Sequence, residues 1–330
     1  MYSRSAFVTA HALAAAGLLA LAACDTAPPP REDVAKLAVD AGWPTIPADA
    51  KFGEVSAVDV DAQGNVWVLH RAGRVWAEPF PKEPITEPTV FKFAPDGTLL
   101  AQWGAGLFIM PHGLSIDPQG KVWITDPGLE QVFRFSPDGV QELVIGTRGE
   151  TAQDSAHFGR PADVAFLGVE ADGRVLVADG YVNTRIAEFD GAGRFIREWG
   201  TFKVAHAVAV DATRIYVADR ENARIQVFDH AGTLIESRVS PAGNHTYSLK
   251  PLSGGRLLAV EGRDGADRKG AIIRIYAADG TITASYDVGL PGDGASLGHD
   301  LAIGADGHIY VADVPAGRVV RFQLPFQSDQ

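Results

Sequence analysis

The sequence contains one cysteine, Cys24, among its 330 residues. A single cysteine cannot form an intramolecular disulfide or a site with several thiolate ligands. Any transition-metal site must therefore use histidine, aspartate or glutamate. Basic residues are also few, because 29 Lys and Arg stand against 41 Asp and Glu and give a formal net charge of −12. Nucleic-acid binding needs clustered Lys and Arg, so we expect no nucleic acid as a partner.

Helical periodicity is also missing, since no long segment after the N-terminal region has the apolar spacing of an amphipathic helix. The chain has instead 36 Gly and 20 Pro, which fits many turns between short strands. Its 46% hydrophobic and 21% charged residues are ordinary values for a globular protein.

The N-terminus carries an apolar run, residues 6–23, that follows the positive charge of Arg4. The run is too short and too alanine-rich for a membrane span and predicts an export signal. It ends in Leu-Ala-Ala-Cys, which resembles the lipobox of bacterial lipoproteins. The resemblance implies that residues 1–23 are a signal peptide and that Cys24 becomes the lipidated N-terminus. The alternative is an ordinary cleaved signal followed by an incidental cysteine.

Removal of residues 1–23, which hold one Arg and no acidic residue, changes the formal charge from −12 to −13. Residues 24–50 are proline-rich and aperiodic and predict a tether after the lipidated cysteine. We expect residues 51–330 to form one catalytic domain. The protein is then exported and anchored to the bacterial cell envelope on the periplasmic side, with membrane contact through the lipid alone.

A repeated pattern of strands decides the predicted fold. A short apolar strand, a turn with Asp and Gly, a second apolar strand, a polar loop and a third strand recur along the chain. The clearest copy covers residues 112–126 and 131–139. The other copies start near Ser56, Ala162, His206, His245 and His299.

Apolar and polar residues alternate with period two in these segments, as strands require. Six copies of roughly 40–55 residues fit six four-stranded blades, and thus an all-β, six-bladed β-propeller with repeats that resemble the NHL type. An open solenoid is the alternative. It is disfavoured because no capping repeats are evident.

Three histidines occupy the same position in alternate copies. His112 and His206 each lie five residues before the turn aspartate, and His299 lies five residues before Gly304. Their separations of 94 and 93 residues each correspond to two blades. Alternate blades of six are about 120° apart on the ring, so the three side chains should meet at the axis.

Three neutral imidazoles with one open position are a common arrangement of catalytic zinc. We therefore predict a zinc site, against the alternative of three unrelated core histidines. His245 lies near the corresponding position of the fifth copy, but an insertion at residues 250–255 blurs the alignment. Its role is left open between an accident and an additional channel residue.

Four segments resemble, in order and at similar spacing, the peptidyl-α-hydroxyglycine α-amidating lyase, the second catalytic half of the animal peptide-amidating enzyme. The likeness runs from about residue 55 to residue 322 through all six blades. The segments are residues 70–76, 107–117, 179–186 and 218–226.

The resemblance implies two metals. In that family three histidines bind zinc, and they match the three of this chain. A structural calcium is held by two backbone carbonyls and one aspartate, which match Val58, Leu114 and Asp300. Calcium takes hard oxygen ligands of this kind. The calcium would hold blades 1, 2 and 6 together where the ring closes.

The family's active site contains one Tyr and two Arg, which correspond to Tyr181, Arg71 and Arg220. The reaction splits a carbinolamide into an amide and glyoxylate. Zinc would act as a Lewis acid on the hydroxyl and Tyr181 as the base. A phenol with an unperturbed pKa of about 10 needs nearby positive charge to ionise at neutral pH. An Arg fork suits the substrate carboxylate.

The expected partner is therefore a small molecule or peptide that bears a carboxylate, and we expect the enzyme to be a monomer. Two other functions stay open. One is a non-catalytic NHL propeller that binds peptide or protein and uses its metal structurally. The other is a metal-dependent lactonase or esterase, which a site of carboxylates and Asn would favour. The match of Tyr181, Arg71 and Arg220 favours the lyase.

Overall fold

The computed structural model describes residues 34–40, 42–47, 50, 52–168, 173–262, 271–288 and 297–325. The predicted signal peptide, Cys24 and the first part of the predicted tether lie outside these residues. Within the described ranges, no helix has the length and apolarity needed to cross a membrane. The helices seen there are single 3₁₀ turns, η1 (Arg220–Asn222), η2 (Pro241–Gly243) and η3 (Ser253–Gly255).

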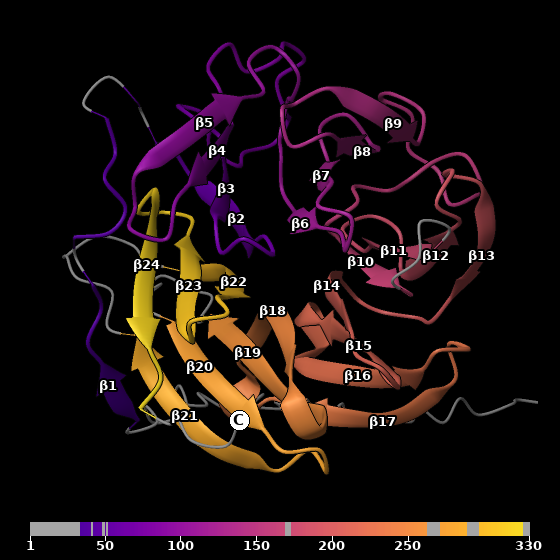
Figure 1. The fold of residues 1–330 in the computed structure, drawn as a ribbon. Helices are drawn as coiled ribbons and strands as arrows, with labels where there is room; N and C mark the ends of the chain where they lie inside the picture. The colour runs from indigo at the N-terminus through magenta and orange to yellow at the C-terminus, as the bar shows by residue number, and fades with distance from the viewer. Residues whose placement is uncertain are drawn as a thin grey trace, which may run out of the picture. The chain divides into compact units, whose positions relative to one another are not determined.

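Six antiparallel sheets surround one axis, with the first strand of each sheet innermost (Figure 1), so the fold is a six-bladed β-propeller. Blade 1 comprises β2 (Val55–Val60), β3 (Val66–His70), β4 (Val90–Phe93) and β5 (Leu99–Trp103). Blade 2 comprises β6 (Leu114–Ile116), β7 (Val122–Asp126), β8 (Gln131–Phe135) and β9 (Gln141–Ile145). Blade 3 comprises β10 (Asp163–Leu167), β11 (Arg174–Asp179), β12 (Arg185–Phe189) and β13 (Phe195–Trp199).

The remaining blades follow the same order. Blade 4 comprises β14 (Ala205–Val210), β15 (Arg214–Asp219), β16 (Arg224–Asp229) and β17 (Leu234–Val239). Blade 5 comprises β18 (His245–Leu252), β19 (Arg256–Gly262), β20 (Ala271–Tyr276) and β21 (Ile282–Val288). Blade 6 has three strands among the described residues, β22 (Gly298–Ile303), β23 (His308–Asp313) and β24 (Arg318–Gln323).

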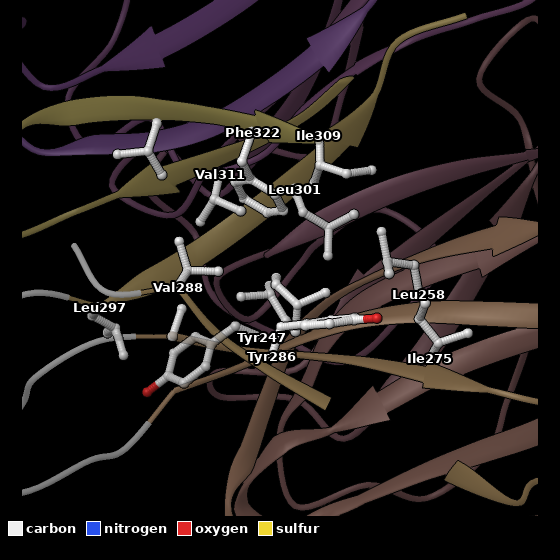
Figure 2. Packing of buried hydrophobic residues seen from close by; sticks show 14 residues of the cluster. Tyr247, Leu258, Ile275, Tyr286, Val288, Leu297, Leu301, Ile309, Val311 and Phe322 are labelled. Atoms are coloured by element: carbon white, nitrogen blue, oxygen red, sulfur yellow. The ribbon is translucent and has the colours of Figure 1, made fainter. Parts of the chain in front are cut away.

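Burial follows the place of each strand in its blade. The middle strand β7 is buried at every residue, because both of its faces meet neighbouring blades. The outer strands β5 and β13 alternate between half-buried and exposed residues, the pattern of a sheet edge that faces solvent. Figure 2 shows how blades pack, with Leu258 and Ile275 of blade 5 facing Leu301, Ile309 and Phe322 of blade 6.

The aspartate that recurs in the turn after the first strand has a structural role. Asp117 accepts hydrogen bonds from the backbone N–H groups of Gln119 and Lys121, and its Oδ2 accepts one from Trp123 Nε1 at 2.9 Å. In blade 1 the equivalent Asp61 binds the indole N–H of Trp67 at 3.0 Å. The turn and the following strand are thereby fixed together, which explains the Asp–Gly pattern of the repeat.

The N-terminal segment differs from the predicted tether, because residues from Val34 onward belong to the same compact unit as the blades. The strand β1 (Ala35–Leu37) pairs in parallel with β21 at the outer edge of blade 5. Asp40 then bridges to Arg321 of β24, at the edge of the three-stranded blade 6. Composition alone suggested an unstructured linker, whereas these residues pair with two exposed sheet edges.

Trp43 fixes this segment to the propeller. Its ring lies 4.8 Å from that of Tyr310 and 6.0 Å from that of Phe93, so it contacts blades 6 and 1 together. The side chain is 4% exposed. The segment therefore covers the junction between the last blade and the first.

We expect Trp43→Ala to lower the free energy of unfolding by about 3 kcal/mol, because truncation of a buried aromatic ring removes its contacts and leaves a cavity. Urea unfolding would measure the change. Ile46→Ala is the matched control, since Ile46 lies in the same segment but is 37% exposed and should change stability by less than about 0.5 kcal/mol. Equal effects for the two variants would contradict the packing role.

Candidate metal centre and active site

The structure brings His112, His206 and His299 together at the axis. A ring nitrogen of each lies within 4.8 Å of one from each of the others, and all three side chains are buried. Their ring centroids are 4.7 to 5.0 Å apart. The register of the repeats predicted the three histidines on alternate blades. Closure of the ring brings their side chains close together.

A local irregularity aims these residues inward. In blades 4 and 6 the ladder between the first two strands shifts at His206 and His299, which are left unpaired as β-bulge residues. A bulge turns a side chain away from the alternation of its strand. His299 and its neighbour Asp300 consequently both line the small cavity that the three histidines surround. The blade 5 bulge falls at Tyr247.

The fifth blade therefore places Tyr247, not His245, at the ring position. His245 Nδ1 instead lies 3.9 Å from Glu221 Oε1, beside η1. The backbone carbonyl of Tyr247 accepts a hydrogen bond from His206 Nδ1 at 2.8 Å. This contact could not be read from the sequence, because the two residues belong to adjacent blades.

Each histidine is held in this way by the next blade. His112 Nδ1 lies 2.8 Å from the carbonyl oxygen of Ala162, and His299 Nδ1 lies 2.7 Å from that of Ser56. A carbonyl oxygen only accepts hydrogen bonds, so each Nδ1 carries the proton and each Nε2 keeps its lone pair. Histidines that ligate metals are commonly oriented by such a bond from the other ring nitrogen.

The protonation state also suits a metal ligand. Burial, followed by the neighbouring His299 and Arg71, holds the pKa of His112 well below its ordinary value. Burial and the charge of Arg220 do the same for the pKa of His206. Neutral imidazoles with free Nε2 lone pairs are the donors that Zn²⁺ takes in catalytic sites. These residues therefore fit the zinc ion that the family resemblance implies.

Tyr181 lies at the same centre. Its hydroxyl oxygen is 2.8 Å from His112 Nε2 and 3.1 Å from His206 Nε2. The preceding residue must be small, because a Cβ on Gly180 would lie 2.2 Å from the carbonyl oxygen of Ala205. Gly180 thus lets the loop after β11 approach blade 4 closely enough for the phenol to reach both imidazoles.

Arg220 begins η1 and donates a hydrogen bond from Nη1 to the Tyr181 hydroxyl oxygen at 3.1 Å. Its Nε binds Glu221 at 3.0 Å. The guanidinium also lies over the rings of Tyr181 and Tyr247, at 5.1 and 5.3 Å from their centroids. A positive charge is therefore fixed beside the phenol oxygen.

Arg71 is buried at the edge of the site, and two hydrogen bonds hold its guanidinium. Its Nη1 donates to Glu54 Oε2 at 2.6 Å, and its Nε donates to the carbonyl oxygen of Pro111 at 3.0 Å. The guanidinium lies 5.1 Å from the ring centroid of Trp76. Glu54 and Pro111 therefore fix the guanidinium next to the residue that precedes His112.

Trp76 was not identified from the sequence, although it lies in one of the segments that carry the family resemblance. Its ring is 4.9 Å from that of Tyr181, 5.5 Å from that of His112 and 4.8 Å from that of Phe80. The two aromatic rings form an apolar wall over one side of the centre. Trp76 and Phe80 lie in the loop after β3, and the fold of this loop brings the ring of Trp76 to His112 of blade 2 and Tyr181 of blade 3.

Three residues match the calcium ligands of the family and lie on the inner strands β2, β6 and β22: Val58, Leu114 and Asp300. Asp300 Oδ2 accepts a hydrogen bond from the Val58 N–H at 2.9 Å, which joins blades 6 and 1. Its Oδ1 accepts from Ser248 Oγ at 2.6 Å and from the Leu301 N–H at 2.8 Å. Leu114 and Asp300 both line a second, larger cavity, to which the histidines do not contribute.

Comparisons with known proteins agree with this architecture. The NHL repeat family profile matches residues 202–228. A gluconolactonase from Xanthomonas campestris aligns with a TM-score of 0.61 at 14% identity, over 83% of this chain and 87% of that chain. Virginiamycin B lyase from Staphylococcus aureus aligns with a TM-score of 0.55 at 14% identity, over 83% and 85%. At such identity these structures establish the fold alone.

Two curated relatives are much more similar in sequence. Peptidyl-glycine alpha-amidating monooxygenase B of Xenopus laevis is 33% identical over 316 residues, and this chain spans only 35% of its length. The alignment covers 86% of this chain. The probable peptidyl-alpha-hydroxyglycine alpha-amidating lyase of Caenorhabditis elegans is 32% identical over 305 residues, which are 83% of each protein. The chain therefore belongs to the peptidyl-alpha-hydroxyglycine alpha-amidating lyase family, a family of lyases.

Proposed function

We propose that this protein is a zinc-dependent lyase that cleaves a carbinolamide resembling a peptidyl-α-hydroxyglycine into an amide and glyoxylate. One observation carries the proposal. The Tyr181 hydroxyl oxygen lies 2.8 Å from His112 Nε2 and 3.1 Å from both His206 Nε2 and Arg220 Nη1. The relatives' names indicate the same reaction class.

The metal would be held through Nε2 by three histidines, His112, His206 and His299. When bound, zinc acts as a Lewis acid toward the substrate hydroxyl and makes that hydroxyl more acidic. The Nδ1 contacts keep the imidazoles in the tautomer and orientation that this role needs. The proposed chemistry requires this one metal.

Tyr181 is the proposed proton carrier. Its oxygen takes the proton of the carbinol hydroxyl, the carbonyl of glyoxylate forms, and the C–N bond breaks with its electron pair on nitrogen. Return of the proton from the phenol to that nitrogen yields the amide and restores the enzyme. Tyr181 takes part as the phenolate, and the guanidinium of Arg220 stabilises the negative charge on that oxygen before the first transfer and again after the second.

The substrate carboxylate is the proposed partner of the arginines. Glu54 and Pro111 hold Arg71 in one orientation, so little side-chain entropy is lost when an anion binds. Trp76 covers the side of Tyr181 and limits the access of water to the reacting atoms. The lactonase alternative is disfavoured because the groups that meet at the Tyr181 hydroxyl are imidazoles and a guanidinium rather than carboxylates and Asn.

Incubation of zinc-replete protein with α-hydroxyhippurate should release glyoxylate and benzamide in equal amounts, at a rate far above that of a buffer control. Glyoxylate is measured colorimetrically and benzamide by chromatography. If neither product forms across the neutral and mildly alkaline range, the non-catalytic propeller that binds peptide or protein becomes the better hypothesis.

The location of the enzyme is a separate proposal. Lipidation of Cys24 would place the propeller at the cell envelope, with the chain between Cys24 and Val34 as the link to the folded unit. Substrates would then be carboxylate-bearing small molecules or peptides outside the cytoplasm, and the proposed enzyme acts as a monomer.

A further inference from the structure

Lys250 is a cation inside the axial channel that the proposed reaction does not use. It lies on β18, three residues after Tyr247, and lines an axial cavity of about 600 Å³. Asp59, Asp163 and Asp300 line the same cavity. These three carboxylates and one ammonium form a polar cluster that we call the axial charge cluster.

The ammonium of Lys250 reaches across the ring. Its Nζ lies 3.2 Å from Asp59 Oδ1, although Lys250 belongs to blade 5 and Asp59 to blade 1. Blade 6, which carries Asp300, lies between them. The ammonium is therefore placed where the last blade meets the first, the position at which a calcium ion would join blades 1, 2 and 6.

The position of Lys250 among three carboxylates affects the pKa of its ammonium group. Burial opposes a charged lysine, but Asp59, Asp300 and Asp163 together raise the pKa of Lys250 above its ordinary value. Lys250 thus acts on the whole axial charge cluster and not on one partner alone.

The side-chain oxygens around Lys250 are largely engaged already and offer a calcium ion few free lone pairs. Calcium takes six to eight oxygen ligands with available lone pairs. Asp300 Oδ1 already accepts two hydrogen bonds and Oδ2 accepts one. Asp59 Oδ2 is occupied by the Ile116 N–H at 2.8 Å, and its Oδ1 faces Lys250. A divalent cation would also meet the repulsion of the ammonium.

We propose that Lys250 supplies the positive charge at the closure of the ring, in place of the calcium that the family resemblance implies. The fold of this protein then does not depend on calcium. The ammonium neutralises part of the axial charge cluster and ties the first blade to the fifth across the sixth. This inference concerns stability and is independent of the proposed lyase activity.

Calcium content and thermal unfolding test the proposal. The full-length protein is loaded with zinc, transferred to calcium-free buffer and then measured with and without added Ca²⁺. We expect no bound calcium by elemental analysis and no change in Tm for the wild type. Bound calcium in a one-to-one ratio, or a rise in Tm of about 5 °C on addition of Ca²⁺, would overturn the proposal.

Lys250→Met removes the ammonium and keeps most of the aliphatic stem. We expect its Tm without calcium to fall by about 5 °C or more, because a charge that neutralised buried carboxylates is lost. Added Ca²⁺ should restore part of that loss by acting as the missing cation. A variant with unchanged Tm would contradict the proposal, and the wild-type measurements decide the question if Lys250→Met does not fold.

Lys92→Met is the matched control, because Lys92 lines the same cavity but pairs with Asp61 at 3.2 Å and lies over the ring of Trp67. It should lower Tm only slightly and should not respond to Ca²⁺. A calcium response as large as that of Lys250→Met would show that any lost cavity charge has this effect, and would overturn the specific role of Lys250.

Discussion

Replacement of Tyr181 by phenylalanine is expected to lower kcat for glyoxylate release by about 10³-fold while the protein keeps its zinc. The reason is that the variant loses the group proposed to move the proton, and general acid–base catalysis contributes about 10² to 10⁴ in rate. The metal should stay because the Nδ1 bonds that orient His112 and His206 do not involve the phenol. Steady-state kinetics and zinc content measured on the same sample would check both parts.

Tyr216→Phe is the matched control for this variant. Tyr216 is also buried, and its hydroxyl donates to Asp211 Oδ2 at 2.8 Å, on the inner side of a turn in blade 4. It should keep the wild-type rate with a small loss of stability. If Tyr181→Phe turns over at more than a tenth of the wild-type rate, Tyr181 is not the proton carrier, whatever its distance from the histidines.

Replacement of His206 by alanine is expected to abolish zinc binding and with it glyoxylate release. Two imidazoles would remain, one fewer than the three protein ligands typical of a catalytic zinc site. The carbonyl oxygen of Tyr247 would also lose its buried donor, which costs roughly 1–3 kcal/mol. Elemental analysis, activity and thermal unfolding of the same preparation would separate metal loss from unfolding.

His230→Ala serves as its control, since His230 lies outside the ring position and its Nε2 donates to the carbonyl oxygen of Asp211 at 3.0 Å. That variant should keep both zinc and activity. Zinc retained at wild-type stoichiometry in His206→Ala would mean that the metal is held elsewhere. Activity retained without zinc would mean that the lyase reaction does not need the metal.

The blades and the ring of histidines were predictable from the sequence because they depend on short-range patterns. Alternation of apolar residues marks strands, and in several blades an aspartate marks the turn after the first strand. Counting from Asp117 and Asp211 then gives His112 and His206. The blade 5 position was not predictable in this way, because the insertion at residues 250–255 blurs the alignment and left the role of His245 open, whereas the fold has Tyr247 at that position.

The N-terminal segment shows a different limit. Residues 34–47 contain no periodic pattern, so composition predicted a tether. The described residues among them are placed by the outer sheet edges of blades 5 and 6 and by the aromatic contacts of Trp43. A segment whose strand partner lies about 250 residues later in the chain carries little signal of its own.

By itself, the sequence determined that this protein is a six-bladed propeller with three histidines in phase on alternate blades, because periodicity and spacing are properties of the chain. Only the tertiary structure decided what surrounds them. The carbonyl that orients each imidazole, the Arg220 contact with the phenol and the ammonium of Lys250 all come from other blades. Such contacts depend on the packing of the blades around the axis, which places residues of different repeats within hydrogen-bonding distance.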